Sequence, residues 1–287
     1  MKKERVDKLV HQAGLTESRE QARRLIMAGQ IYDQNNQRYD KPGEKIDASK
    51  ELHIKGKTLP YVSRGGLKLE KALESFDVDV KDKILLDIGA STGGFTDAAL
   101  QKGARMSYAL DVGYNQLAYK LRQDPRVVVM ERQNFRYSKP EDFQQGQPNF
   151  ASIDVSFISL GLILPPLKDI LVDQGDVVAL IKPQFEAGPD RVGKHGVIRE
   201  AQVHADVLKE VLTMMSQEGY EIINLTYSPI KGGEGNIEFL AHLKNAKLPN
   251  QSYTHIDISD LVQKAHETMW GNKEARLSSP ISIGEGE

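Results

Sequence analysis

The sequence predicts two domains: a small N-terminal α+β domain, followed by a larger α/β domain whose doubly wound, mostly parallel sheet has seven strands. From residue 83 onward, segments rich in Val, Ile and Leu alternate with segments of helical apolar spacing, and this alternation is typical of parallel βαβ units. Before residue 59 the apolar segments are shorter and are separated by turn residues. A chain of 287 residues is long enough to bury one sizeable core and a second, smaller one.

The N-terminal domain begins with two segments of helical apolar spacing, residues 5–13 and 17–28, each followed by a glycine. The short apolar pieces QIYD, RYD, EKI and ELHI come next, and Asn35-Asn36 and Lys41-Pro42-Gly43 separate them. We therefore predict a pair of helices and a small hairpin sheet over residues 1–58.

The remaining boundaries follow from composition and periodicity. Gly and Pro are frequent between the two domains, which predicts a linker over residues 59–66. The α/β domain is predicted over 67–245, and residues 246–287 are predicted to form a C-terminal helix and a flexible tail. Helices are expected at 67–76, 93–103, 115–123, 157–171 and 200–217. Strands are expected at 83–89, 105–113, 126–130, 149–156, 176–181, 220–228 and 236–243, the last two as an antiparallel pair.

Composition excludes several classes of site. The chain has no cysteine, so it has no disulfide framework, thiolate zinc site or cysteine nucleophile, and we expect no metal site. The longest apolar stretch, Phe157 to Leu167, is interrupted by Gly161 and closed by Pro165-Pro166, whereas a membrane-spanning helix needs roughly 20 apolar residues. The basic N-terminus lacks the apolar core of a signal peptide. We therefore expect a soluble, cytoplasmic protein that does not bind membranes.

A Gly-rich turn between the first predicted strand of the α/β domain and the following helix predicts a nucleotide site. Glycines at such a turn let the backbone approach a ligand, and the helix N-terminus faces it. Asp111 ends the next strand, where an acid can accept both hydroxyls of a ribose. Asn134 follows the third strand and is expected beside the adenine. The candidate cofactor-binding residues of the turn itself are Asp87, Gly89, Ser91, Thr92, Gly93, Gly94 and Phe95.

The details of this turn favour S-adenosyl-L-methionine over a dinucleotide. The dinucleotide fingerprint needs glycine at position 91, where Ser91 stands, and it does not call for an acid before its first glycine. Asp87 suits a sulfonium amino acid, because its carboxylate can serve the methionine end directly or through water. The competing explanation is a tight turn whose glycines serve packing alone. We therefore expect the Rossmann-like sheet of a methyltransferase.

The N-terminal domain is the basic part of the chain. Residues 1–58 contain 13 Lys and Arg against nine Asp and Glu, whereas the whole chain has a net charge of -2. On the second helix Arg19, Arg23 and Arg24 are spaced to share one face and to meet successive phosphates. A solvated helix face would show the same pattern.

The first 58 residues also resemble the αL RNA-binding motif, which occurs in a small-subunit ribosomal protein and in pseudouridine synthases. The resemblance rests on the runs R-V-D-K-L-V, G-L-T-E-S-R-E-Q-A-R-R-L-I, G-Q-I-Y and Y-D-K-P-G-E-K-I. The family often has Asn-Gly in the hairpin where this chain has Asn35-Asn36-Gln37, so the turn is expected to differ. The resemblance implies RNA binding, and the candidate contacts are Arg5, Arg19, Arg23, Arg24, Arg64 and Lys194.

Four further residues match the catalytic order Lys, Asp, Lys, Glu of a methyltransferase superfamily: Lys68 in RGGLKLEKAL, Asp154 in SIDVSF, Lys182 in LIKPQFE and Glu238 in GNIEFL. On these residues the whole chain resembles the TlyA, or hemolysin A, type of ribosomal RNA methyltransferase, whose catalytic half is similar to FtsJ. The resemblance implies 2'-O-ribose methylation that uses S-adenosyl-L-methionine, with ribosomal RNA or ribosomal subunits as partner. From the residues alone, Asp154 and Lys182 end predicted strands and Glu238 opens one, so they could converge. Singly, each also has a plain structural explanation, such as an Asp that caps a helix.

Lys182 is the candidate base that removes the 2'-hydroxyl proton. A free lysine titrates near about 10.4, so a second ammonium at Lys68 and partial burial would have to lower its pKa. Asp154 and Glu238 would orient the amines and push that pKa back up, and Lys68 could instead hold the substrate. The loop 183–197 has hinge glycines and basic residues, which predicts a lid over RNA, although a solvated loop would have the same composition.

Other functions compete with this one. Methylation at carbon 5 of a pyrimidine usually needs a cysteine nucleophile, and the chain has none. Exocyclic amine methylation commonly uses Asp/Asn-Pro-Pro-aromatic, and of that motif Asp154-Val155-Ser156-Phe157 keeps only the two ends. A membrane-active hemolysin would need a long apolar span or an amphipathic stripe, and neither is visible. A catalytically inactive, RNA-binding ribosome-assembly factor stays open, as do the target nucleotide, the ribosomal subunit and the oligomeric state.

Overall fold

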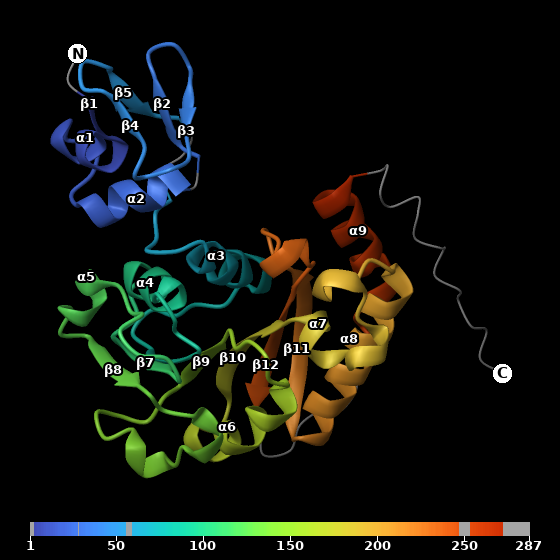
Figure 1. The fold of residues 1–287 in the computed structure, drawn as a ribbon. Coiled ribbons are helices and arrows are strands. Elements are labelled where there is room, and N and C mark those ends of the chain that lie inside the picture. Colours follow the sequence, from blue (N-terminus) through green and yellow to red (C-terminus); the bar gives the residue numbers. More distant parts are fainter. Residues whose placement is uncertain (1–2, 28, 56–58, 247–252, 272–287) are drawn as a thin grey trace. The chain divides into compact units, whose positions relative to one another are not determined.

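The computed structural model describes residues 3–27, 29–55, 59–246 and 253–271, and the chain divides into two compact units, Met1–Pro60 and Tyr61–Glu287 (Figure 1). The N-terminal unit contains two helices and two small antiparallel sheets. Strand β1 pairs with β4, and the second sheet has the order β3-β2-β5. The elements are β1 (Lys3–Arg5), α1 (Val6–Gln12), α2 (Arg19–Met27), β2 (Ile31–Asp33), β3 (Arg38–Tyr39), β4 (Lys45–Asp47) and β5 (Leu52–Ile54).

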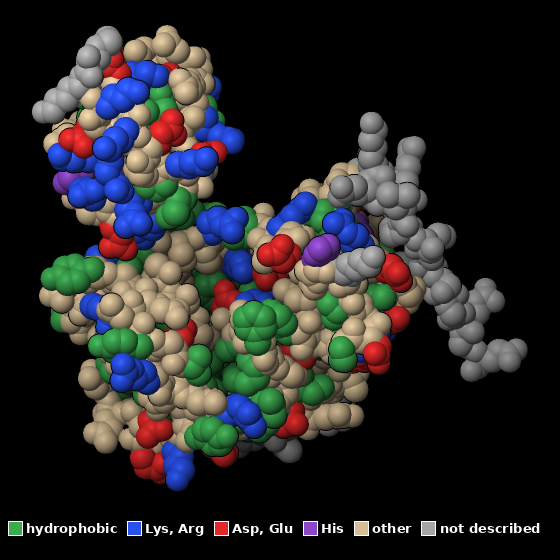
Figure 2. Space-filling view, viewed as in Figure 1, with side chains coloured by type: hydrophobic (Ala, Val, Ile, Leu, Met, Phe, Trp, Pro, Cys, Tyr) green, Lys and Arg blue, Asp and Glu red, His purple; other side chains and the backbone are tan. Residues whose placement is uncertain are grey.

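The core of the N-terminal unit is formed by the inner faces of α1 and α2 and by single residues of the strands. Val10, Ile26, Ile31 and Tyr39 are among its buried side chains. The predicted helices and hairpin strands are therefore present, although EKI pairs with the N-terminal strand instead of joining the hairpin sheet. On the visible face of this unit Lys and Arg side chains gather (Figure 2).

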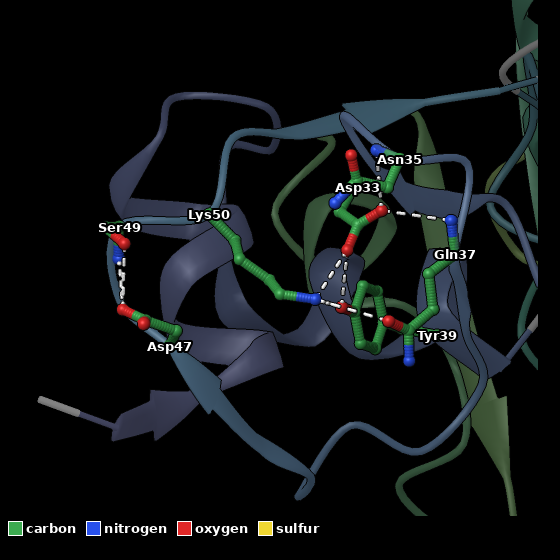
Figure 3. A network of polar contacts seen from close by, with 7 residues as sticks. All are labelled: Asp33, Asn35, Gln37, Tyr39, Asp47, Ser49 and Lys50. Atoms are coloured by element: carbon green, nitrogen blue, oxygen red, sulfur yellow. Dashed lines mark hydrogen bonds and ion pairs between the residues drawn. The ribbon is translucent and has the colours of Figure 1, made fainter. Parts of the chain in front are cut away.

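A network of polar side chains closes the β2-β3 hairpin (Figure 3). The fully buried Asp33 accepts hydrogen bonds from the Lys50 ammonium at 2.6 Å and the Tyr39 hydroxyl at 2.9 Å, both on Oδ2. Its Oδ1 accepts from the backbone N–H groups of Asn35 and Gln37. The Lys50 ammonium holds the pKa of Asp33 well below its usual range. Asp33 therefore organises a turn that lacks the Asn-Gly pair of ordinary two-residue hairpins.

The second unit is built on a seven-stranded sheet with the order β11-β12-β10-β9-β6-β7-β8. Strand β12 runs antiparallel to both of its neighbours, and the other neighbouring pairs are parallel, which confirms the predicted fold class. The strands are β6 (Ile84–Ile88), β7 (Met106–Asp111), β8 (Val127–Glu131), β9 (Phe150–Ile153), β10 (Gly175–Ile181), β11 (Tyr220–Tyr227) and β12 (Phe239–Asn245).

Helices cover both faces of this sheet, because successive strand residues point to opposite sides. Leu85 of β6 belongs to the apolar cluster under α3, α4 and α5, and its neighbour Leu86 belongs to the cluster under α6, α8 and α9. The helices are α3 (Gly65–Phe76), α4 (Gly94–Gln101), α5 (Tyr119–Arg122), α6 (Leu164–Ile170), α7 (Pro183–Glu186), α8 (Ala201–Gln217) and α9 (Ile258–Trp270).

Three predicted boundaries differ from the structure. Residues 61–66 belong to the second unit and not to a linker, because Tyr61 and Val62 are buried there and the Val62 N–H donates to Asp97 Oδ2 at 2.7 Å. The helix expected over 157–171 begins at Leu164, beside the two prolines that suit a first helical turn. The helix expected over 115–123 is only one turn long. The flexible tail predicted after α9 lies outside the described residues.

Candidate active site

Four charged side chains from four elements meet at one edge of the sheet. Lys68 lies in the first turn of α3, Asp154 follows β9, Lys182 follows β10 and Glu238 precedes β12. Lys182 Nζ lies 2.6 Å from Asp154 Oδ1, and Lys68 Nζ lies 2.6 Å from Glu238 Oε2 and 3.7 Å from Asp154 Oδ2. The structure therefore brings together all four residues predicted as catalytic, and Asp154 is shared between the two ammonium groups.

The topology of the sheet explains this convergence. Strands β9 and β10 are parallel neighbours, so the residues that follow them, Asp154 and Lys182, lie at the same edge. Strand β12 is antiparallel to β10, and its first residue Phe239 lies opposite Ile181, so Glu238 also reaches that edge. Residues far apart in sequence become neighbours at the edge where open α/β sheets bind their ligands.

Burial separates Asp154 from the other three residues. Lys68 and Lys182 are 8% exposed and Glu238 is 2% exposed, whereas the Asp154 side chain is 21% exposed. Buried charges are tolerated when they are paired and hydrogen-bonded, and this group contains two cations and two anions. Lys182 also donates a hydrogen bond to Ser156 Oγ at 3.0 Å.

A cavity of about 450 Å³ lies beside Asp154 at the carboxyl ends of β6, β7 and β9. Of the predicted cofactor-binding residues, Gly89, Ser91, Asp111, Asn134 and Asp154 line it. A Cβ atom at Gly89, where φ is +86°, would lie 2.4 Å from the Asp154 carbonyl oxygen, so only glycine fits there. The Asp111 carboxylate accepts hydrogen bonds from the N–H groups of Ser91 at 2.8 Å and Gly113 at 2.6 Å, which fix it at the cavity wall.

The Asp87 carboxylate is predicted to serve the methionine end directly or through water, and because Asp87 does not line this cavity, the structure gives no support to direct contact. Asp87 is 1% exposed and accepts hydrogen bonds from Thr96 N at 3.0 Å, Thr96 Oγ1 at 2.7 Å and Ser152 Oγ at 3.0 Å. Burial raises the pKa of Asp87 to about 6. The side chain points into the fold and ties β6 to α4 and β9.

The second half of the Gly-rich turn also packs against the fold instead of lining the cavity. A Cβ atom at Gly93 would lie 2.3 Å from Leu121 Cδ1, and one at Gly94 would lie 2.3 Å from Ser63 Oγ. Phe95 is buried in the apolar cluster under α3. The carbonyl of Thr92, the remaining predicted residue, accepts a hydrogen bond from the N–H of Ala118. For these four positions, the packing explanation of the turn describes the structure better than ligand contact.

The sequence interpretation missed an aromatic pair beside Lys182. Phe157 is 89% exposed, has φ of +62° and lines the cavity. Its ring centroid lies 4.9 Å from that of Phe185, and the Lys182 ammonium lies 5.9 Å from the Phe185 centroid. A bulky residue with positive φ is strained, and such strain is concentrated at functional sites. The signal in the sequence was the aromatic that follows Asp154 in SIDVSF.

The candidate RNA contacts divide into two groups, three residues that line one hollow and three that lie outside it. Arg5, Arg19 and Arg23 line a surface hollow of about 490 Å³ on the N-terminal unit, together with Asp7 and Glu20. The buried Asp7 carboxylate pairs with Arg5 at 2.9 Å and with Arg19 at 3.0 Å, so it orients both guanidinium groups. Three predicted contacts lie outside this hollow: Arg24 is half-buried, Arg64 is exposed before α3, and the side chain of Lys194 lies outside the described residues.

The predicted lid over 183–197 contains several short helical turns, α7 among them. Arg191, one of the basic residues of this segment, forms a two-point ion pair with Glu210 of α8, at 2.8 and 2.7 Å. The side-chain amide of Asn236 donates to the carbonyl of Gly196 at 2.8 Å and its oxygen accepts from Ile198 N at 3.1 Å. These contacts tie the segment to α8 and to the loop before Glu238.

The fold and the site together define the class of protein: an α/β enzyme with a ligand cavity beside a Lys-Asp-Lys-Glu group. Comparison with known families assigns it further. The FtsJ-like methyltransferase family matches residues 61–245 and the S4 domain matches residues 4–52. The chain belongs to the FtsJ-like methyltransferase family and carries an S4 domain at its N-terminus.

Several relatives match most of this chain over most of their own length. A Bacillus subtilis (strain 168) protein named as a candidate rRNA methyltransferase, YqxC, is 58% identical over 97% of this chain and 99% of its own. The Mycobacterium tuberculosis (strain H37Rv) protein named 16S/23S rRNA (cytidine-2'-O)-methyltransferase TlyA is 40% identical over 84% of this chain and 89% of its own. A solved structure from Streptococcus thermophilus, named as a candidate hemolysin, is 56% identical, covers 96% of this chain and 99% of its own, and has a TM-score of 0.77.

Another relative, from Brachyspira hyodysenteriae, is named hemolysin A and is 44% identical over 83% of this chain and 98% of its own. In the part of this chain that the structure describes, no helix combines the length and the apolar character needed to cross a membrane.

Proposed function

We propose that this protein transfers a methyl group from S-adenosyl-L-methionine to the ribose 2'-oxygen of a cytidine in ribosomal RNA. The observation that carries the proposal is the Lys68-Asp154-Lys182-Glu238 group, whose partly exposed member Asp154 lines a cavity suited to a nucleoside. The nucleoside and the class of RNA follow from the name of the TlyA relative. When bound, the cofactor supplies an electrophilic methyl group.

The cavity residues fit such a cofactor. The Asp111 carboxylate, held by two backbone N–H groups, stands where it can accept the two ribose hydroxyls. Asn134 lines the same cavity on the side of β8 and is available to the adenine. Gly89 provides close backbone approach at the Asp154 end. Asp87 supports this arrangement from beneath, through Thr96 and Ser152.

The four charged residues would handle the proton of the substrate hydroxyl. As the 2'-oxygen bonds to the methyl carbon, its proton must leave, and Lys182 in its neutral form would accept it. Asp154 and Ser156 hold the Lys182 amine in place from two directions. Glu238 Oε2 lies 2.6 Å from Lys68 Nζ, so Asp154 Oδ1 is left to pair with Lys182. Lys68 would then contact the ribose or a phosphate of the substrate.

Two surfaces would present the RNA. The exposed ring of Phe157, which packs on the Phe185 ring beside Lys182, provides a face on which the target base can stack, once the base has left its helix. The hollow formed by Arg5, Arg19 and Arg23 would hold backbone phosphates on the S4 domain.

The test is transfer of labelled methyl groups to ribosomal RNA and to separate small and large subunits that lack the modification, followed by mapping of the labelled nucleotide. We expect the label on the 2'-oxygen of a cytidine. Label on a base would contradict the ribose assignment. Binding of RNA and cofactor without transfer to any of these substrates would favour the inactive assembly factor.

A further inference from the structure

The loop after β9 and the segment after β10 are joined by successive contacts, of which the first two belong to the site already described. Lys182 holds Asp154 and Ser156, and the Phe185 ring lies against the Phe157 ring. Both pairs connect the same two segments in the same order along the chain, so the two loops form one local structure.

Glu186 makes the third contact between these segments. Its Oε2 accepts a hydrogen bond from Ser159 Oγ at 2.7 Å, and its Oε1 accepts one from Leu160 N at 2.8 Å. Ser159 Oγ in turn accepts a hydrogen bond from Gly161 N at 3.1 Å. The carboxylate thus closes the start of the short helical turn over residues 160–162.

The surroundings of Glu186 differ from those of an ordinary surface carboxylate. Burial raises the pKa of Glu186, and among the described residues it forms no ion pair, in contrast to Asp154 and Glu238. Glu186 is half-buried, and even partial burial of a carboxylate whose partners are a hydroxyl and an amide costs free energy. Two charge-assisted hydrogen bonds to one loop offset this cost.

The loop that Glu186 fixes carries a strained residue. Phe157 has φ of +62° and its side chain is 89% exposed, so its own burial does not hold it in place. A strained backbone persists only when the surrounding structure holds it. The contacts that hold it include the Phe185 ring against Phe157 itself and the Lys182 hydrogen bond to Ser156 before it. After it, Glu186 holds Ser159 and Leu160, two and three residues further along the chain.

We propose that Glu186 is a positioning residue for methyl transfer: by holding Ser159 and Leu160 it fixes the Phe157 ring, on which the target base stacks, against Phe185, the ring beside Lys182. This inference rests on the proposed function. Glu186, the glutamate of the K-P-Q-F-E run, helps to place the substrate without touching it.

The first experiment is a double-mutant cycle between Glu186→Ala and Phe157→Ala, measured as kcat/KM for RNA and as cofactor affinity. Stacking of one base is worth 1–3 kcal/mol, so each single variant should lower kcat/KM about tenfold, with cofactor affinity unchanged. In the Phe157→Ala background, Glu186→Ala should lower kcat/KM by less than about twofold, because the ring that it positions is gone. Equal losses in both backgrounds would overturn the proposal.

Matched variants separate positioning from folding. Ser159→Ala removes one of the two hydrogen bonds and should produce a smaller loss of the same kind, whereas Glu186→Gln, which can still accept from Leu160, should restore part of the activity. Asp260→Ala removes a surface carboxylate that pairs with Lys264 on α9 and should leave kcat/KM unchanged. A loss with Asp260→Ala equal to that with Glu186→Ala would refute a specific role.

Hydrogen exchange tests the same inference without the reaction. In the protein free of RNA, Glu186→Ala should speed amide exchange in residues 156–162, whereas exchange in 84–88 of the central strand should stay the same. Unchanged exchange over 156–162 would contradict the inference even if the protein methylates RNA. If exchange over 156–162 is faster but the original protein transfers no methyl group, the local role of Glu186 is supported and the proposed function is refuted instead.

Discussion

Each of the two units contains a buried group of charged side chains, and the two groups differ in what they hold. In the S4 domain, Asp33, Tyr39 and Lys50 lie within 17 residues of one another and close a hairpin on itself (Figure 3). In the methyltransferase domain, Lys68 and Glu238 are separated by 170 positions and meet beside Asp154, which lines the cavity. Both groups combine lysine with carboxylate at 2.6 Å.

The difference shows that a buried ion pair alone does not indicate a catalytic site. In the S4 group the carboxylate of Asp33 is fully buried, and its oxygens are occupied by four donors. In the methyltransferase group Asp154 stays 21% exposed and lines the cavity, and the strained Phe157 lies beside it. We therefore expect substitutions in the first group to change stability and substitutions in the second to change activity.

The largest expected effect is that of Lys182→Ala on methyl transfer. Loss of a general base lowers rates by 10²–10⁴-fold, so kcat should fall about a thousandfold. Lys182→Arg is the matched control, because it keeps a cation beside Asp154 but cannot accept a proton. Single-turnover kinetics with saturating cofactor measures both. Near-normal turnover by the arginine variant would show that Lys182 acts only through its charge.

The complementary prediction concerns Asp33→Asn, which removes the carboxylate that pairs with Lys50. We expect the S4 domain to lose stability and RNA affinity to fall on the order of a hundredfold, because phosphate contacts supply most of the affinity. Cofactor affinity should be unchanged. Circular dichroism melting and RNA-binding titrations measure these effects. A normal melting curve combined with lost transfer would mean that the two groups do not differ as described.

A third buried polar group, a pair of histidines, extends the comparison to the dependence of stability on pH. His204 Nδ1 lies 2.8 Å from His266 Nε2 between α8 and α9, and burial lowers the pKa values to about 3 and about 4. The unfolded chain binds protons at these residues below about pH 6.5, whereas the folded chain does not. Stability is therefore complete above that pH and is lost as the pH falls toward 4.

Between pH 7 and pH 6 the pair should cost about 1 kcal/mol of unfolding free energy, measured by urea denaturation. In the variant His266→Gln this dependence should be about half as steep, since one of the two histidines remains. A pH dependence that is the same in the variant and in the original chain would assign the effect to other groups.

Site residues whose place depends on where a strand ends could be predicted from the sequence. Site residues whose role depends on the direction of the side chain could not. Asp154 and Lys182 follow apolar runs that are plainly strands, so their convergence follows from parallel pairing. Asp87 lies near the end of β6 but still inside the strand, paired with Ser152 of β9, and its carboxylate points inward to Thr96 and Ser152. Gly94 is required by Ser63, which lies 31 positions away in a segment that reads as a linker.

The smallest expected effect tests the surface of the S4 domain. Arg5 and Arg19 are paired with Asp7, whereas Arg23 lines the same hollow and forms no ion pair within the described residues. Arg23→Ala should therefore weaken RNA binding only about threefold and reduce the slope of log K against log salt concentration by about 1, the loss of one phosphate contact.

Arg38→Ala is the matched control, because Arg38 belongs to another element and pairs with the exposed Asp40. Equal salt slopes for Arg23→Ala and the original chain would place the phosphates elsewhere. An effect of Arg23→Ala on kcat would instead mean that this arginine orients the RNA for the reaction, so the division between a binding unit and a reacting unit would have to be given up.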